Sequence, residues 1–123
     1  MLYLHIWTDD AGESHISERQ PDFEERLGYA LGVPPVAVTQ AMEAGVVHFL
    51  RLPSRWVGDL HPAPARQYVI QAQGRLEVTT SDGATVTTGA GTVWLVEDTT
   101  GKGHRTAVVS DEDSIALVVT LDG

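Results

Sequence analysis

Residues 61–74 of this chain read His-Pro-Ala-Pro-Ala-Arg-Gln-Tyr-Val-Ile-Gln-Ala-Gln-Gly, and residues 97–104 read Glu-Asp-Thr-Thr-Gly-Lys-Gly-His. Each segment joins a strand-like run to a proline-rich or glycine-rich turn. Each also carries one histidine at the end of such a run, namely His61 and His104. The pattern therefore predicts two strand–turn units that bring their histidines to strand ends.

Strand-like runs with turn signals between them continue along the rest of the chain. The predicted strands are residues 2–7, 46–52, 67–73, 75–80, 85–88, 92–96, 105–109 and 115–121. Asp82-Gly83 predicts a hairpin, because glycine accepts the positive φ that tight hairpin turns need. Residues 9–20 predict a polar loop, and residues 23–31 predict one short helix capped by Asp22. Many short strands without long intervening helices predict an all-β sandwich or barrel.

The first segment resembles the first motif of the cupin family, which combines histidines, a glutamate and a closing glycine. Gly74 matches the closing glycine, and His61 falls in the histidine region. Gln67 stands where the family has its glutamate, with six residues between it and Gly74. Pro62 and Ala63 supply no second histidine. The motif therefore lacks one imidazole and its carboxylate.

The second segment resembles the second cupin motif. Gly91 precedes the predicted strand 92–96, and Gly101 and His104 match the motif's glycine and histidine. Residues 97–100 replace the proline region, and Val108 lies near the unfilled asparagine position. The chain is similar to small single-domain cupins with His-Pro-Ala-Pro and Asp-Thr-Thr-Gly-x-Gly-His segments. That resemblance implies a double-stranded β-helix, a jelly-roll-like barrel, preceded by an N-terminal strand.

The resemblance also implies how the chain is organised. It implies one cupin domain over residues 1–123, with the barrel core at about residues 45–121. Small cupins are commonly homodimers, so it implies a homodimer as well.

Metal-binding cupins use three histidines and a glutamate, and this chain offers His61, Gln67 and His104 at matching positions. A divalent transition metal such as Fe, Mn, Ni or Zn needs three or four converging ligands. The missing imidazole and the neutral amide remove a donor and a negative charge. We therefore expect that no metal is bound tightly. The alternative is that His48 or His15 supplies a further ligand.

Of the remaining histidines, His48 allows two interpretations. His48 shares a strand face with Val46 and Leu50, so it either lines the barrel or is a partly buried histidine with satisfied hydrogen bonds. The second reading is favoured. His15 belongs to a Glu-Ser-His segment that is a candidate cover for the barrel mouth. His5 alternates with apolar neighbours and is expected to pack.

Three amides on one face of the predicted strand 67–73 are unusual for a core, because each buried amide needs hydrogen-bond partners. Gln67 and Gln71 therefore suit a cavity that holds a polar ligand or ordered water. The alternative is the exposed face of an edge strand. Trp94 is a candidate for an aromatic cavity wall, or for the core.

Acid–base chemistry has one candidate pair, Glu97 and Asp98. Successive strand residues point to opposite faces, so only one of them can face a pocket, where burial would make it a base. A solvated strand end is the reading we favour. The sequence has neither a Gly-x-Ser-x-Gly elbow nor a complete phosphate loop around Lys102.

The charge balance excludes some partner classes. Seventeen acidic against eight basic residues give a net charge of −9, which disfavours nucleic acid and anionic membranes. The first residues lack a basic start and a cleavage site, and no apolar run approaches the roughly 18 residues of a membrane span, so we expect a cytoplasmic protein.

Two functional classes follow from the sequence, and a third stays open. The favoured class is a small-molecule-binding barrel, metal-free or weakly metal-binding, whose ligand contacts His61, Gln67, His104, His48, Gln71 and Trp94. The second is a metal-dependent cupin enzyme, a dioxygenase or isomerase, that uses His61, Gln67 and His104 as ligands. The third is a structural or protein-interaction barrel without catalysis.

Overall fold

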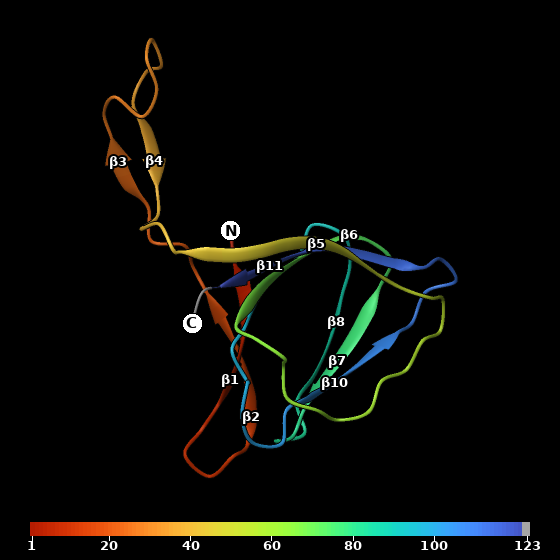
Figure 1. The fold of residues 1–123 in the computed structure, drawn as a ribbon. Helices are drawn as coiled ribbons and strands as arrows, with labels where there is room; N and C mark the ends of the chain where they lie inside the picture. The colour runs from red at the N-terminus through yellow and green to blue at the C-terminus, as the bar shows by residue number, and fades with distance from the viewer. Residues whose placement is uncertain (122–123) are drawn as a thin grey trace.

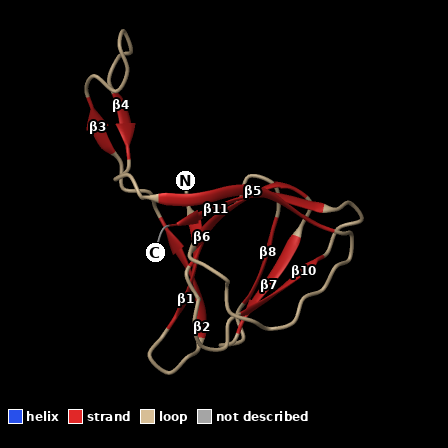
Figure 2. Cartoon of the chain, in the orientation of Figure 1, coloured by secondary structure: helices blue, strands red, loops and turns tan. Residues whose placement is uncertain are grey.

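The computed structural model describes residues 1–121, which form eleven strands and no helix (Figures 1 and 2). The all-β prediction is therefore confirmed. The strands are β1 (Tyr3–Thr8), β2 (Ser14–Arg19), β3 (Glu24–Arg26), β4 (Val36–Val38), β5 (Ala44–Leu52), β6 (Gln67–Gln73), β7 (Leu76–Thr80), β8 (Thr85–Thr88), β9 (Val93–Val96), β10 (His104–Val108) and β11 (Ser114–Leu121).

Two sheets form the body of the molecule. The larger sheet has the order β2-β1-β9-β6-β11-β5, and the smaller one has the order β10-β7-β8. The three strands of the smaller sheet lie side by side in Figure 1. Only β1 and β9 run parallel, and the other neighbours are antiparallel. The side chains that alternate inward along these strands meet between the sheets. Together with Ala63, from the segment between β5 and β6, they form a core of Ile6, Leu76, Val78, Trp94, Val96 and Val108.

Gly74 carries the chain from the larger sheet to the smaller one, between β6 and β7. Its φ is 83°, and a Cβ there would lie 2.8 Å from the Cα of Ser114. Glycine is therefore needed for both its conformation and its close approach to β11. The hairpin predicted at Asp82-Gly83 joins β7 to β8, and Gly83 has a φ of 93°.

The loop predicted over residues 9–20 is wrong in its second half. Residues 14–19 form β2, which pairs with β1 from Thr8 opposite Ser14 to Tyr3 opposite Arg19. Ile16 is the one apolar residue of this strand. Because β2 is the edge of the larger sheet, its outward positions need no apolar side chains, and the pattern of a half-buried strand is lost.

The short helix predicted over residues 23–31 is also wrong. Strands β3 and β4 form a separate two-stranded ribbon that projects from the body (Figure 1). Gly28 has a φ of 67°, which a right-handed helix does not accept. The exposed segment also has no surface against which a helical face could pack, and so short a helix is marginal without packing. Within residues 1–121 no helix has the length and apolar character to span a membrane.

Candidate functional site

A cavity of about 400 Å³ lies between the two sheets. Its walls are mainly aliphatic and aromatic, and they come from both sheets and from the segment between β5 and β6. Its polar side chains are His48, His61, Gln67, His104, Thr106, Ser114 and Thr120. An apolar cavity with a few polar groups is the usual form of a small-molecule site.

His61 and His104 lie side by side at this cavity. Reciprocal backbone hydrogen bonds join them, from each amide nitrogen to the other residue's carbonyl oxygen at 3.0 Å. Their ring centroids are 5.7 Å apart. Gly103 makes this approach feasible, because a Cβ there would lie 2.0 Å from the carbonyl carbon of His61. The glycine that precedes His104 therefore sets the spacing of the two imidazoles.

His104 is held by a buried carboxylate. Its Nδ1 lies 2.6 Å from Oδ2 of Asp98, whose side chain is fully buried. The other oxygen of Asp98, Oδ1, has no hydrogen-bond partner among the described residues. The solvated strand end that we favoured for Asp98 is therefore wrong. The segment after β9 turns inward here, and the Asp98 carbonyl accepts a hydrogen bond from the amide of Ala63.

The partners of the two histidines determine which ring nitrogen is free. Nδ1 of His61 lies 2.7 Å from the carbonyl oxygen of Asp59, which can only accept. Nδ1 of His104 faces the Asp98 carboxylate, which also accepts. In its neutral form each ring therefore carries its proton on Nδ1, which leaves the Nε2 lone pair for a ligand.

Gln67 and Trp94 also line the cavity, whereas Gln71 does not. The amide of Gln71 is almost fully buried, where its oxygen accepts hydrogen bonds from the Thr88 hydroxyl at 2.5 Å and the Trp94 indole at 2.9 Å. Gln71 thus forms hydrogen bonds within the core and holds Trp94 in place as a wall of the cavity. The strand that carries these amides is central in its sheet, so the exposed-edge alternative does not apply.

His48 lines the cavity from β5 and is exposed. The partly buried histidine that we favoured is therefore wrong. The reason is the position of β5 at the edge of the larger sheet, where no further strand of this chain covers it. The structure thus brings His48, His61, Gln67, Trp94 and His104 to one cavity. Their part in binding stays a prediction.

Solved structures of known fold resemble this arrangement. A cupin domain of Bordetella pertussis aligns over 85% of this chain and 98% of its own, with a TM-score of 0.52 and 17% identity. The Cnp3 cupin domain of Schizosaccharomyces pombe aligns over 85% of this chain and 86% of its own, with a TM-score of 0.51 and 12% identity. This chain has the cupin fold. No family model matches its sequence, and no curated protein matches it significantly.

The cupin cavity does not present a complete set of metal ligands. Within residues 1–121 no group of three His, Cys, Asp or Glu side chains is placed to hold a metal ion. His61 and His104 offer two free imidazole nitrogens, and Gln67 adds a neutral amide. A tightly bound divalent transition metal needs more donors than this. The residues present do not fit such a metal.

Glu97 and His5 lie on the outer face of the cupin barrel, away from the cavity. Nε2 of His5 lies 2.6 Å from one oxygen of Glu97, and Nε of Arg66 donates to the other at 2.7 Å. Burial lowers the pKa of His5. Burial alone would raise the pKa of Glu97, but the hydrogen bonds from Arg66 and His5 bring it below its ordinary value. His5 is buried, as expected of a packing residue, and this pair joins β1 to the end of β9.

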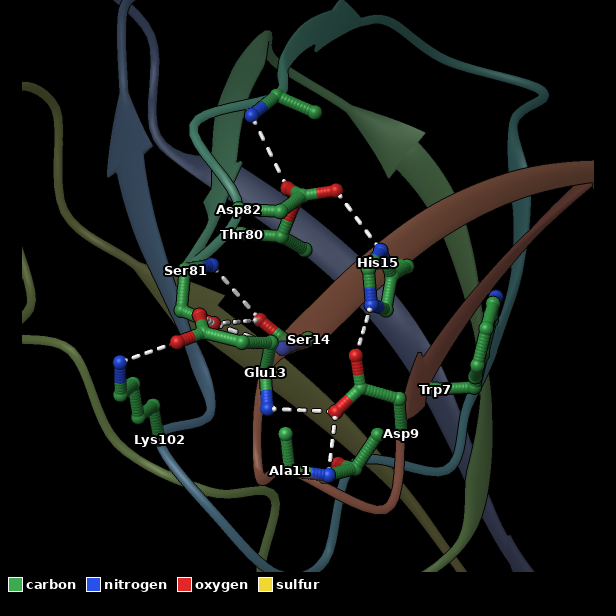
Figure 3. A network of polar contacts seen from close by, with 12 residues as sticks. Trp7, Asp9, Ala11, Glu13, Ser14, His15, Thr80, Ser81, Asp82 and Lys102 are labelled. Atoms are coloured by element: carbon green, nitrogen blue, oxygen red, sulfur yellow. Dashed lines mark hydrogen bonds and ion pairs between the residues drawn. The ribbon is translucent and has the colours of Figure 1, made fainter.

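His15 does not cover the cavity mouth. It stacks on Trp7 with ring centroids 4.6 Å apart, and its two nitrogens contact Asp9 at 2.7 Å and Asp82 at 3.0 Å (Figure 3). We call His15 and its contacts with Asp9 and Asp82 the latch. The latch joins the β1–β2 turn to the β7–β8 hairpin, and therefore one sheet to the other. The hydrogen bond to Asp9 raises the pKa of His15.

The same latch lowers the pKa of both carboxyl groups. The hydrogen bond with His15 lowers the pKa of Asp9. The pKa of Asp82 is lowered first by a hydrogen bond from the Thr80 hydroxyl, then by one from the backbone amide of Ala84, and then by that with His15. Beside it, Ser81 and Lys102 both contact Glu13 (Figure 3). Lys102 is thus a surface ion-pair partner.

Asp98 and Asp59 were missed as residues that orient the site. Asp98 carried a sequence signal, since it lies six positions before His104 in the same turn. Asp59 acts through its backbone carbonyl, so its side-chain identity gives no signal.

Proposed function

We propose that the cavity binds a small organic molecule that is largely apolar and carries one hydrogen-bond donor. The observation that carries the proposal is the pair of free Nε2 atoms on His61 and His104, presented to an apolar cavity of about 400 Å³. Nitrogen lone pairs accept hydrogen bonds, so they select an O–H or N–H group on the ligand. The apolar walls supply affinity through buried area.

A matched pair of probes tests this selection. 4-Butylphenol carries an O–H donor, and 4-butylanisole has a similar apolar body without the donor. We expect the phenol to raise the melting temperature more than the anisole, since ligand that binds only the folded state stabilises it by mass action. His104→Ala and His61→Ala should remove the difference between the probes. His15→Ala, whose histidine lies outside the cavity, should keep it. Equal shifts for both probes in the wild-type protein would count against the donor requirement.

A second candidate function is proton transfer, and the His104–Asp98 pair favours it. A fully buried carboxylate orients the imidazole at 2.6 Å through Nδ1 and leaves Nε2 toward the cavity. An oriented imidazole of this kind acts as a general base, and its carboxylate stabilises the imidazolium that forms. His104 would then be the catalytic residue, and Asp98 its positioning residue.

5-Nitrobenzisoxazole tests for such a base without knowledge of the natural substrate. Nε2 of His104 would take the proton from carbon 3, the N–O bond would break, and a coloured cyanophenolate would form. General bases contribute about 10²- to 10⁴-fold, so His104→Gln, which has no base at this position, should reduce the rate by about that factor, toward the background rate of the buffer. Asp98→Asn should lower kcat more than it changes KM. A wild-type rate no faster than free imidazole would exclude proton transfer, while leaving the binding proposal to the phenol experiment.

A metal-dependent reaction remains the alternative from the sequence. The two-imidazole donor set argues against it, because no group of three His, Cys, Asp or Glu side chains within residues 1–121 is placed to hold a metal ion.

A further inference from the structure

Ser114, the first residue of β11, carries a buried hydroxyl that has no partner within the part of the chain that the structure describes. The residue is 2% exposed, and its side chain forms no hydrogen bond with any of residues 1–121. The other buried polar side chains each form at least one, namely those of His5, Ser14, Gln71, Thr80, Thr88 and Asp98. Buried polar groups are nearly always paired, so the hydroxyl of Ser114 needs an explanation.

The side chain of Ser114 faces the cavity. Alternate residues of a strand point to the same side of the sheet, and Ser114, Ala116, Val118 and Thr120 all line the cavity from β11. The neighbours of Ser114 on this wall are apolar, because Ala116 follows it along the inner row and Leu52 lies opposite it on β5. The hydroxyl is therefore a polar group presented to the cavity by an apolar part of the wall.

Ser114 and His104 lie at opposite ends of the cavity. The backbone of Ser114 packs against Gly74, where a Cβ would lie 2.8 Å from the Cα of Ser114. Gly74 leads into β7, whose first residue, Leu76, pairs with Val108 at the end of β10. His104 begins β10, and the four strand residues from His104 to Val108 correspond to about 13 Å.

This separation limits the ligands that can reach both groups. A hydrogen bond places its two heavy atoms about 3 Å apart, so on the order of 7–10 Å remain between two polar atoms of one ligand. The cavity wall between the two ends includes Val78, Trp94 and Val118, so the middle of that ligand is apolar. The hydroxyl of Ser114 can both donate and accept, and it therefore pairs with a ligand hydroxyl.

We propose that the ligand is an elongated molecule with a polar group at each end, and that Ser114 binds the end that His61 and His104 do not. The inference rests on the proposed function and narrows it, since the proposed function requires a polar group only at the histidines. In the empty cavity only water can pair with the Ser114 hydroxyl. A ligand with an apolar end would displace that water and leave the hydroxyl unpaired, whereas a terminal hydroxyl on the ligand would replace the water.

4-(3-Hydroxypropyl)phenol tests the second contact. It differs from 4-butylphenol only by a hydroxyl in place of the terminal methyl group, so the two probes have closely similar shapes. Isothermal titration calorimetry gives the Kd of each. We expect the alcohol to bind the wild-type protein at least as tightly as 4-butylphenol does. In Ser114→Ala the alcohol should bind about 5- to 100-fold more weakly than 4-butylphenol, because its hydroxyl is then buried without a partner.

Ser114→Ala also has an expected effect on the ligand-free protein. The substitution removes an unpaired hydroxyl, so the variant should melt at or above the temperature of the wild-type protein. Ser14→Ala is the matched control, because the Ser14 hydroxyl is also buried but donates to the carbonyl oxygen of Gly103 at 2.6 Å. Ser14→Ala should melt about 4 °C lower or more. An equal fall in Ser114→Ala would mean that its hydroxyl pairs within the chain, and would overturn the inference.

The probes separate failure of this inference from failure of the proposed function. Ser17→Ala, whose hydroxyl contacts Trp7 outside the cavity, should keep the wild-type ratio of the two Kd values. If 4-butylphenol still exceeds 4-butylanisole but Ser114→Ala also keeps that ratio, the role of Ser114 is wrong and the proposed function stands. If neither phenol binds the wild-type protein, both are wrong.

Discussion

Gly103 offers the sharpest test of how the two histidines are held together. In Gly103→Ala the new Cβ would lie 2.0 Å from both the carbonyl carbon and the carbonyl oxygen of His61, and 2.2 Å from the nitrogen of Pro62. Ordinary carbon contacts lie at about 3.5–4.0 Å, so the backbone of His61 must move by roughly 1.5 Å. That movement breaks the two reciprocal hydrogen bonds between His61 and His104.

The magnitude follows from two contributions to the free energy of unfolding. A left-handed φ of 76° costs an alanine about 1–2 kcal/mol, and loss of two backbone hydrogen bonds costs about 0.5–1.5 kcal/mol each. We expect Gly103→Ala to lose about 2–5 kcal/mol. Gly91→Ala is the matched control, because Gly91 has a φ of 90° with nothing within 4 Å of its Cβ position. It should lose only the 1–2 kcal/mol of backbone strain.

Thermal unfolding followed by circular dichroism and tryptophan fluorescence measures the difference. At about 4 °C per kcal/mol for a chain of this size, Gly103→Ala should melt about 8–20 °C lower and Gly91→Ala about 4–8 °C lower. Gly103→Ala should also lose the preference for the phenol probe, whereas Gly91→Ala should retain it. Equal destabilisation of the two variants would refute the close approach of Gly103 to His61. Failure of Gly103→Ala alone to fold would agree with it.

Two further predictions concern pH and metal. The raised pKa of His15 means that its latch is fully stabilising below the unfolded imidazole pKa of about 6.5 and weakens as pH rises through the folded value. The lowered pKa of Asp9 and Asp82 makes their contribution fall as pH drops below about 3.9 and through their folded values. Urea denaturation across pH should show a loss of stability on the alkaline side that His15→Asn removes; an unchanged alkaline limb would contradict the latch. Elemental analysis of freshly purified protein should find sub-stoichiometric Fe, Mn, Ni and Zn, and Gln67→Glu should tighten Zn²⁺ binding by adding a carboxylate; tight one-to-one metal in the wild-type protein would contradict the expectation.

The barrel was predictable because its strands obey local rules. The body strands alternate apolar and polar residues, and Gly74 and Gly83 lie where the chain must take a positive φ. Both rules can be read within a window of a few residues. These rules did not predict β2, because an edge strand with one apolar residue lacks the alternation of apolar and polar residues.

The β3–β4 ribbon and the exposure of β5 were not predictable in this way, although residues 46–52 were predicted as a strand. Residues 23–31 carry apolar side chains at spacings compatible with a helix, yet no part of this barrel is available for a helix to pack against. Whether such a segment forms a helix or an extended ribbon depends on a surface outside the segment. His48 was misjudged for the same reason, since its burial depends on whether anything covers β5, and the pattern of Val46, His48 and Leu50 is the same in either case.

The candidate site was likewise predictable where the local sequence decides it, and not where the three-dimensional packing does. His61, Gln67 and His104 were found because each falls at a site position of the two cupin motifs, and all three line the cavity. Gln71 has the same face and residue type as Gln67, but its neighbours Thr88 and Trp94 satisfy its oxygen. Only the three-dimensional packing separates an amide that supports a wall from an amide that faces a ligand. The sequence could not distinguish them.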